Sequence, residues 1–267
     1  MTLEILTRKP PNGSIKTTPL LFVHGAWHGA WCWDEYWMPY FAQQGYTCYA
    51  PSLRGHGGSL AVKPMWQNSI DDYVADVESV AAQIEHEHDH HPVLIGHSMG
   101  GFITQKYLEQ HTAPAAVLLA SVPHFGALPF MTRNSLRHPI ALLKAIITLR
   151  LDPLVNTPRL TREAFFSADV LQADIERYCA RLNDESWRMA MDILLLNLPR
   201  PHRVKTPLLV IGGEKDAIFH VWETERLARA YKTKAVIMPN SAHDMMLDTR
   251  WQMPADSILV WLNEHAL

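Results

Sequence analysis

The chain has 267 residues, a length that fits one large α/β domain with an insertion better than two small independent domains. Hydrophobic residues make up 48% and charged residues 19%, which allows a sizeable core and excludes a disordered or collagen-like chain. The 24 Lys and Arg against 27 Asp and Glu give a net charge of −3. This balance offers nothing to neutralise a phosphate backbone, so we predict that nucleic acid is not a partner.

Short apolar runs alternate with longer amphipathic segments, a pattern typical of a parallel sheet wound by crossover helices. The apolar runs predict strands buried on both faces, at residues 20–23, 46–50, 93–95, 116–119, 208–211 and 235–238. Helix-spaced apolar residues predict helices at residues 33–44, 70–85, 102–110, 222–230 and 255–263. The predicted fold class is therefore α/β, with a mostly parallel sheet covered by helices.

One connection breaks this alternation. Residues 123–206 separate two predicted strands, whereas an ordinary βα loop has ~2–6 residues. Helical patterns within this connection lie at residues 140–149, 161–166, 171–181 and 186–196, with prolines between them. We predict a helical cap here, inserted between the sixth and seventh strands, and a core domain formed by residues 1–122 and 207–267.

The cysteines and the apolar stretches indicate in which cellular compartment the protein is expected. Cys32, Cys48 and Cys179 are far apart and lack Cys-x-x-Cys spacing, which predicts reduced thiols. The sequence at residues 1–6 does not resemble a signal peptide. The longest apolar-rich stretch, residues 140–151, contains two cations and is shorter than the ~18–20 residues that span a bilayer. We expect a soluble, cytoplasmic protein without stable membrane insertion.

The strand predicted at residues 93–95 leads into Gly-His-Ser-Met-Gly at residues 96–100 and then into a helix. Gly-x-Ser-x-Gly between a strand and a helix is typical of a nucleophile elbow, in which the serine takes strained backbone angles. The neighbours two residues away must lack side chains, which accounts for Gly96 and Gly100. We predict that Ser98 projects from this turn as a nucleophile.

A serine hydroxyl needs a general base and a carboxylate that orients this base. Asp216 follows the strand at residues 208–211, and His243 follows the strand at residues 235–238. The carboxyl ends of parallel strands share one edge of a sheet. We therefore predict a triad of Ser98, His243 and Asp216 at this edge.

Each of these assignments has competitors. Glu214 and Asp244 are the alternative acids, and a solvated loop carboxylate is the alternative role for any of them. His97 adjoins Ser98, but its side chain should point away from the nucleophile and pack. The segment His86–His91 holds four histidines, for which a solvated loop is favoured over a metal site because no spaced carboxylates frame them.

Acyl transfer develops an oxyanion, which needs backbone N–H donors held in place before the reaction. The Met99 amide, directly after the nucleophile, is one predicted donor. The loop after the strand at residues 20–23 supplies the second, assigned to Ala26. Nearby tryptophans are expected to pack the start of a helix, and Trp27 is also assigned as a substrate contact.

With these motifs the chain resembles the α/β-hydrolase fold superfamily, specifically its esterase/lysophospholipase-like serine hydrolases. Residues 24–33 are similar to the oxyanion loop of bacterial hydrolases and plant methylesterases, and residues 53–59 resemble the loop after the next strand. Pro51-Ser52 departs from the pattern, since many relatives have an acidic residue there. The resemblance implies an α/β-hydrolase fold and no metal or organic cofactor.

This resemblance implies hydrolysis of a small-molecule carboxylic ester through an acyl-enzyme. Because the fold does not select the substrate, a lactonase or thioesterase with the same triad and a ligand-binding module with little turnover are the alternatives, and a homodimer is left open. Aromatic residues and methionines in the predicted cap indicate an apolar acyl site or the core of the cap itself. The cap residues assigned to substrate binding are Phe125, Phe130, Met131 and Met189.

Overall fold

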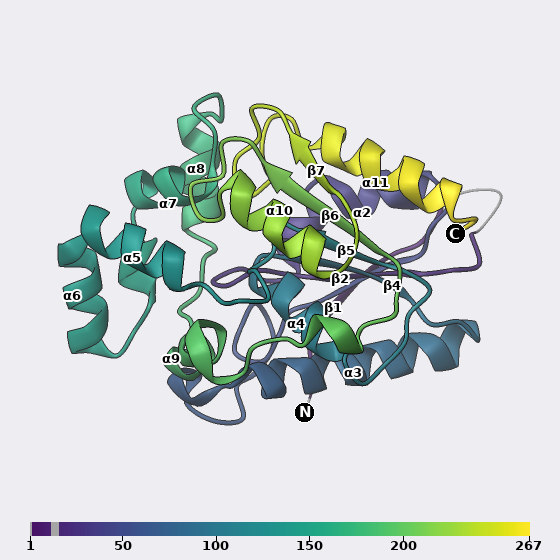
Figure 1. The fold of residues 1–267 in the computed structure, drawn as a ribbon, viewed down its shortest axis with the longest axis horizontal. Helices are drawn as coiled ribbons and strands as arrows, with labels where there is room; N and C mark the ends of the chain where they lie inside the picture. Colours follow the sequence, from purple (N-terminus) through teal and green to yellow (C-terminus); the bar gives the residue numbers. More distant parts are fainter. Residues whose placement is uncertain (1, 12–15) are drawn as a thin grey trace.

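A seven-stranded sheet in the order β1-β3-β2-β4-β5-β6-β7 forms the centre of the computed structural model (Figure 1). The structure describes residues 2–11 and 16–267, so Met1, at which the predicted core domain begins, lies outside the described residues. Six strands run parallel to one another: β2 (Leu20–Val23), β3 (Cys48–Pro51), β4 (Val93–His97), β5 (Ala116–Leu119), β6 (Leu208–Gly213) and β7 (Ala235–Met238). The predicted α/β class is confirmed.

The first strand, β1 (Ile5–Arg8), pairs antiparallel with β3 at one edge of the sheet. It lies outside the predicted strands. Thr7 and Arg8 at its end are exposed, so the segment lacks the continuous apolar run that marks a strand with neighbours on both sides.

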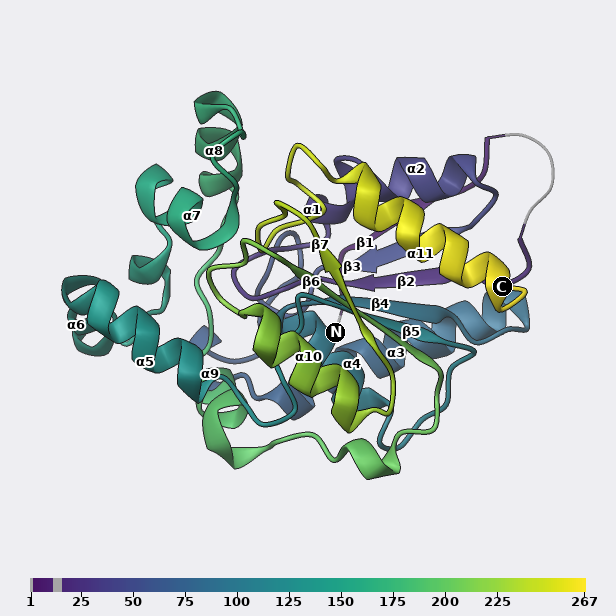
Figure 2. The same ribbon diagram turned by 45° about the horizontal axis from the view of Figure 1, so that its top comes forward.

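Helices cover both faces of the sheet (Figure 2). One face carries α1 (Trp31–Asp34), α2 (Trp37–Gln43) and α11 (Gln252–Glu264). The other carries α3 (Ile70–His88), α4 (Met99–Tyr107) and α10 (Val221–Ala230). The helix predicted at residues 33–44 is two short helices instead. The buried strands and the inner faces of these helices form one continuous apolar core.

The connection between β5 and β6 forms a helical insert that extends to one side of the sheet (Figure 2). Its helices are α5 (Leu128–Arg137), α6 (Pro139–Thr148), α7 (Pro158–Phe165), α8 (Gln172–Cys179) and α9 (Trp187–Met191), and α9 continues as a π-helical segment, Asp192–Leu196. The insert joins β5 to β6, the fifth and sixth strands. The predicted position between the sixth and seventh strands is wrong, because it assumed a strand before the insert that the described residues do not contain.

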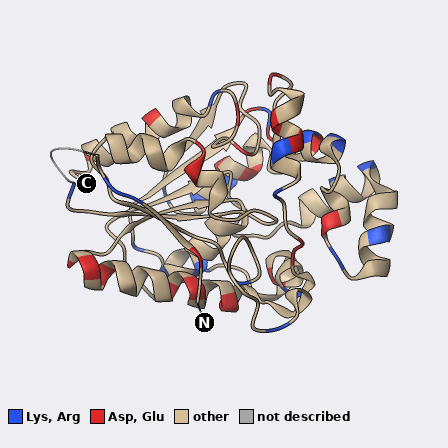
Figure 3. Ribbon diagram, turned by 180° about the vertical axis from the view of Figure 1, so that it is seen from behind, with Lys and Arg blue, Asp and Glu red and all other residues tan. Residues whose placement is uncertain are grey.

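Charged residues are unevenly distributed over the helices (Figure 3). Helix α3 carries Asp and Glu but no Lys or Arg, whereas residues 123–151 contain Lys and Arg but no Asp or Glu. The small net charge therefore includes contributions of opposite sign from an acidic helix beside the sheet and a cationic segment at the start of the insert. No described helix combines the length and the apolar character that crossing a bilayer requires.

Candidate active site

Ser98 occupies the turn between β4 and α4. Its backbone angles, φ 53° and ψ −116°, lie outside the regions that a non-glycine residue normally adopts, a strain of about 1–3 kcal/mol. The Ser98 N–H donates to the Leu119 carbonyl over 3.0 Å, and the Ser98 carbonyl accepts from the N–H groups of Gly101 and Val122 over 3.1 Å each. The turn is thus bonded on both sides, and the Ser98 side chain lines a cavity.

Asp216 and His243 come together at the carboxyl ends of β6 and β7. The Nδ1 atom of His243 lies 2.9 Å from Oδ2 of Asp216, and both residues are buried. Because a carboxylate only accepts hydrogen bonds, His243 Nδ1 carries a proton and donates it to Asp216. The second carboxylate oxygen accepts from the N–H groups of Ile218 at 2.7 Å and Phe219 at 3.0 Å. These bonds hold the carboxylate in one orientation.

The competing side chains have other partners. Glu214 accepts from a backbone N–H in an exposed loop, and Asp244 lies 2.9 Å from His28 Nε2. His97 Nε2 donates to the His243 carbonyl over 3.1 Å. Burial first, and the neighbouring His243 second, lower the pKa of His97 to about 3. His97 is therefore neutral, and its ring supports the backbone of His243.

The histidines at residues 86–91 are not one solvated loop. His86 and His88 occupy the last turn of α3, where His88 Nε2 is hydrogen-bonded to Tyr49 OH over 2.7 Å. His91 lies 3.2 Å from the exposed carboxylate of Glu85. In the described part of the chain, the one group of three potential ligand side chains close enough for a single metal ion is His97, His243 and Asp244. That group belongs to the candidate active site.

Ala26 and Met99, the predicted oxyanion donors, line the same cavity as Ser98. The peptide that carries the Ala26 N–H also carries the Gly25 carbonyl, which is 2.8 Å from His24 Nδ1. The Leu53 N–H donates to His24 Nε2 over 3.0 Å, so Nδ1 holds the proton and donates to Gly25. Burial, and then His56, lower the pKa of His24. A neutral buried histidine thus sets the orientation of the Gly25–Ala26 peptide.

The next peptide along the chain is held by a buried ion pair that the sequence did not predict. His28 Nδ1 is 2.8 Å from the Ala26 carbonyl, and His28 Nε2 is 2.9 Å from the Asp244 carboxylate. Both partners only accept, so both ring nitrogens carry protons. Burial alone would lower the pKa of His28, but Asp244 outweighs it and raises this pKa. Burial likewise works to raise the pKa of Asp244, yet His28 lowers it.

The cavity next to Ser98 is almost entirely apolar. Of the side chains assigned to substrate binding, four line it: Trp27, Phe130, Met131 and Met189. Most of the remaining wall was not predicted from the sequence, and it includes Ala127, Asn134, Leu151, Leu154, Ile193, Leu194, Ile218 and Phe219. For Ile218 and Phe219, one feature of the sequence could have indicated a place in the cavity wall: they lie two and three residues after Asp216. Both the core and the insert contribute to the walls.

Phe125 does not belong to this cavity. Its ring stacks on Trp222 with a centroid distance of 6.1 Å, and the Arg226 guanidinium lies 4.2 Å from its centroid. Both partners come from α10, on the outer side of the core. The assignment of Phe125 as a substrate contact is therefore not supported, since apolar character alone cannot distinguish a cavity wall from a packing contact.

The sheet order, the strained serine between a strand and a helix, and the buried histidine–aspartate pair at the strand ends define a protein of the hydrolase-type α/β class. The model of the alpha/beta hydrolase family matches residues 20–255. The chain belongs to the alpha/beta hydrolase family, and the predicted fold is confirmed.

Relatives with several different activities are similar to this chain. A monoacylglycerol lipase of Mycolicibacterium smegmatis is 23% identical over 239 residues, which cover 84% of this chain and 81% of the relative. A non-heme chloroperoxidase of Burkholderia pyrrocinia is 34% identical over 110 residues, 39% of this chain and 37% of the relative. The structure of an esterase from Exiguobacterium antarcticum has a TM-score of 0.76 at 16% identity, covering 98% of this chain and 95% of that one. These similarities are all consistent with the fold of this chain.

Proposed function

We propose that the protein is a serine hydrolase that cleaves carboxylic esters with small to medium, largely apolar acyl groups. The observation that carries this proposal is the position of Ser98, on a strained turn that opens into an apolar cavity. The same fold carries the bonded pair of His243 and Asp216 at the carboxyl ends of β6 and β7. The names of the lipase and the esterase similar to this chain agree with ester hydrolysis.

In the proposed mechanism, Ser98 Oγ attacks the ester carbonyl while His243 Nε2 takes the hydroxyl proton. Asp216 holds the imidazole in the required tautomer and stabilises the imidazolium. The N–H groups of Ala26 and Met99 bind the oxyanion. His243 then protonates the leaving alcohol, and water, activated by the same histidine, releases the acid from the acyl-enzyme. Each step uses groups of the protein and water, without a metal or an organic cofactor.

We also propose roles for the insert and the core, and a cellular location. Residues 123–206 act as a cap that selects the acyl group over a core of residues 1–122 and 207–267, because the insert supplies much of the cavity wall. Cys32, Cys48 and Cys179 are free thiols, which agrees with a reducing, cytoplasmic location. The proposed partner is a small-molecule ester.

A fluorophosphonate probe tests the proposed function directly, because it reacts with activated serines. We expect one probe per chain, mapped to Ser98, and hydrolysis of p-nitrophenyl esters with an optimum between acetate and laurate. A faster reaction with chain-length-matched lactones or thioesters, compared by kcat/KM, would replace the ester assignment by one of those classes. Without labelling and turnover, the protein is a ligand-binding module instead.

Met189→Ala should shift the acyl preference toward longer chains. Met189 is almost fully buried and lines the cavity from α9, so truncation makes room for additional methylene groups, each with roughly 0.8 kcal/mol of transfer free energy. We expect the ratio of kcat/KM for hexanoate over acetate to rise about tenfold. Met191→Ala is the matched control, since Met191 lies on the same helix, is partly exposed and does not line the cavity. Equal shifts in both variants would contradict this role.

A further inference from the structure

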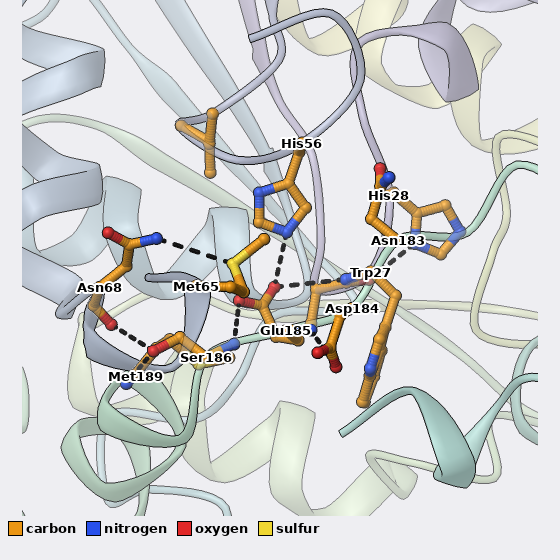
Figure 4. Close-up of polar contacts among 12 residues, drawn as sticks. Trp27, His28, His56, Met65, Asn68, Asn183, Asp184, Glu185, Ser186 and Met189 are labelled. Atoms are coloured by element: carbon orange, nitrogen blue, oxygen red, sulfur yellow. Dashed lines mark hydrogen bonds and ion pairs between the residues drawn. The ribbon is translucent and has the colours of Figure 1, made fainter. Parts of the chain in front are cut away.

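The insert holds the backbone next to the proposed oxyanion donor. Trp27, which follows Ala26, has a φ of 65°, in the left-handed region that a bulky side chain disfavours. Its N–H donates to Oε2 of Glu185 over 3.3 Å, and its carbonyl accepts from the Asn183 N–H over 2.7 Å (Figure 4). Both peptide groups that flank Trp27 are therefore bonded to one short segment of the insert, residues 183–185.

Glu185 is completely buried, and its two oxygens accept four hydrogen bonds. Oε1 accepts from Tyr73 OH at 2.9 Å and from the Ser186 N–H at 2.7 Å. Oε2 accepts from His56 Nε2 at 3.1 Å as well as from Trp27 (Figure 4). The carboxylate thus joins the insert to α3, to the loop after β3 and to the oxyanion loop.

His56 is the counter-charge of Glu185. His56 Nδ1 faces the Arg54 carbonyl at 3.2 Å while Nε2 faces the carboxylate, so both nitrogens carry protons. Burial acts to lower the pKa of His56, but Glu185 outweighs burial and raises this pKa. For Glu185 the directions are reversed: burial acts to raise its pKa, but His56 outweighs burial and lowers it. Burying two ions costs several kcal/mol per ion before their attraction is counted. Packing alone therefore does not explain why an ion pair stands at this position.

We propose that Glu185 is a positioning residue for the oxyanion hole, a role that rests on the proposed ester hydrolysis. By accepting the Trp27 N–H, Glu185 holds the left-handed turn at Trp27 and thereby the adjoining Ala26 peptide. An oxyanion donor must lie 2.7–3.1 Å from the developing charge, and a misplacement of about 1 Å costs about 100-fold in rate. The oxyanion hole is therefore complete only when the insert is seated on the core.

Glu185→Gln tests this role with little change in shape. An amide has one acceptor oxygen, so Gln cannot serve the N–H groups of both Trp27 and Ser186. We expect kcat for the best p-nitrophenyl ester to fall 10- to 100-fold with KM within about twofold. Binding of a trifluoromethyl ketone, whose adduct with Ser98 carries an oxyanion, should weaken by a similar factor.

Asp192→Asn is the matched control for a purely structural contribution. Asp192 is also a fully buried carboxylate of the insert, and it accepts from the Ile70 N–H at the start of α3 over 3.0 Å and from Arg188 Nε over 3.0 Å. It has no hydrogen bond to the oxyanion loop in the described structure. We expect a lower melting temperature with kcat and ketone affinity within about threefold of the wild type.

The outcomes separate the inference from the proposed function. An active wild type whose kcat and ketone affinity survive Glu185→Gln would overturn the inference alone. Equal losses of kcat on Glu185→Gln and on Asp192→Asn would also overturn it, because they would indicate a general effect of loosening the insert. A wild type that neither hydrolyses esters nor reacts with the fluorophosphonate would remove the proposed function, and the inference with it.

Discussion

Ser98→Ala is expected to lower ester turnover by about 10⁴-fold or more. The variant retains the proposed oxyanion donors and the cavity but has no oxygen that can form the acyl-enzyme, and removal of a serine nucleophile has an effect of this size in hydrolases with such a triad. The measurement is kcat/KM on the best p-nitrophenyl ester, together with fluorophosphonate labelling, which should disappear.

Folding should change little in this variant. The hydrogen bonds that hold the turn use the Ser98 backbone, not its hydroxyl, so the melting temperature should stay within a few degrees of the wild type. Ser135→Ala is a control in the insert, where the hydroxyl donates to the Met131 carbonyl one helical turn earlier, and it should leave turnover unchanged. Near-wild-type turnover after Ser98→Ala would contradict the assignment of Ser98 as the nucleophile.

Gly100→Ala should destabilise the fold severely. A Cβ atom at residue 100 would lie 2.2 Å from the Val23 carbonyl oxygen and 2.6 Å from the His24 carbonyl oxygen. Both are backbone atoms, of β2 and of the chain directly after it, so the clash can be relieved only by separating α4 from the centre of the sheet. We expect a loss of more than about 4 kcal/mol, seen as insoluble expression or as a melting temperature lower by ~10 °C or more.

Gly58→Ala is the control for this steric argument. The three heavy atoms nearest to a Cβ atom at residue 58 all belong to the side chain of Glu4, with Oε1 at 2.8 Å, and a side chain can shift at less cost than backbone. The melting temperature should then fall by only a few degrees. If Gly100→Ala were no more destabilising than Gly58→Ala, the tight approach of α4 to β2 would be contradicted.

Much of the fold could be predicted because its signals are local. Six of the strands, most of the helices and the helical character of the long connection between β5 and β6 follow from apolar periodicity within short windows. The edge strand β1 and the helix α5 were missed because polar residues interrupt their apolar runs, Thr7 and Arg8 in β1 and residues 132–135 in α5. The position of the insert between the fifth and sixth strands was also missed, since it depends on the total number of strands before it.

The sequence by itself determined Ser98 as the candidate nucleophile, because its turn needs glycines at fixed spacing, and it placed Asp216 and His243 at strand ends. Only the tertiary structure decided how the oxyanion loop is held. The bond from Trp27 to Glu185 spans 158 residues and that from His28 to Asp244 spans 216. The cost of removing two ions from water is offset only when they lie close together, and these partners lie close together only after the chain has folded.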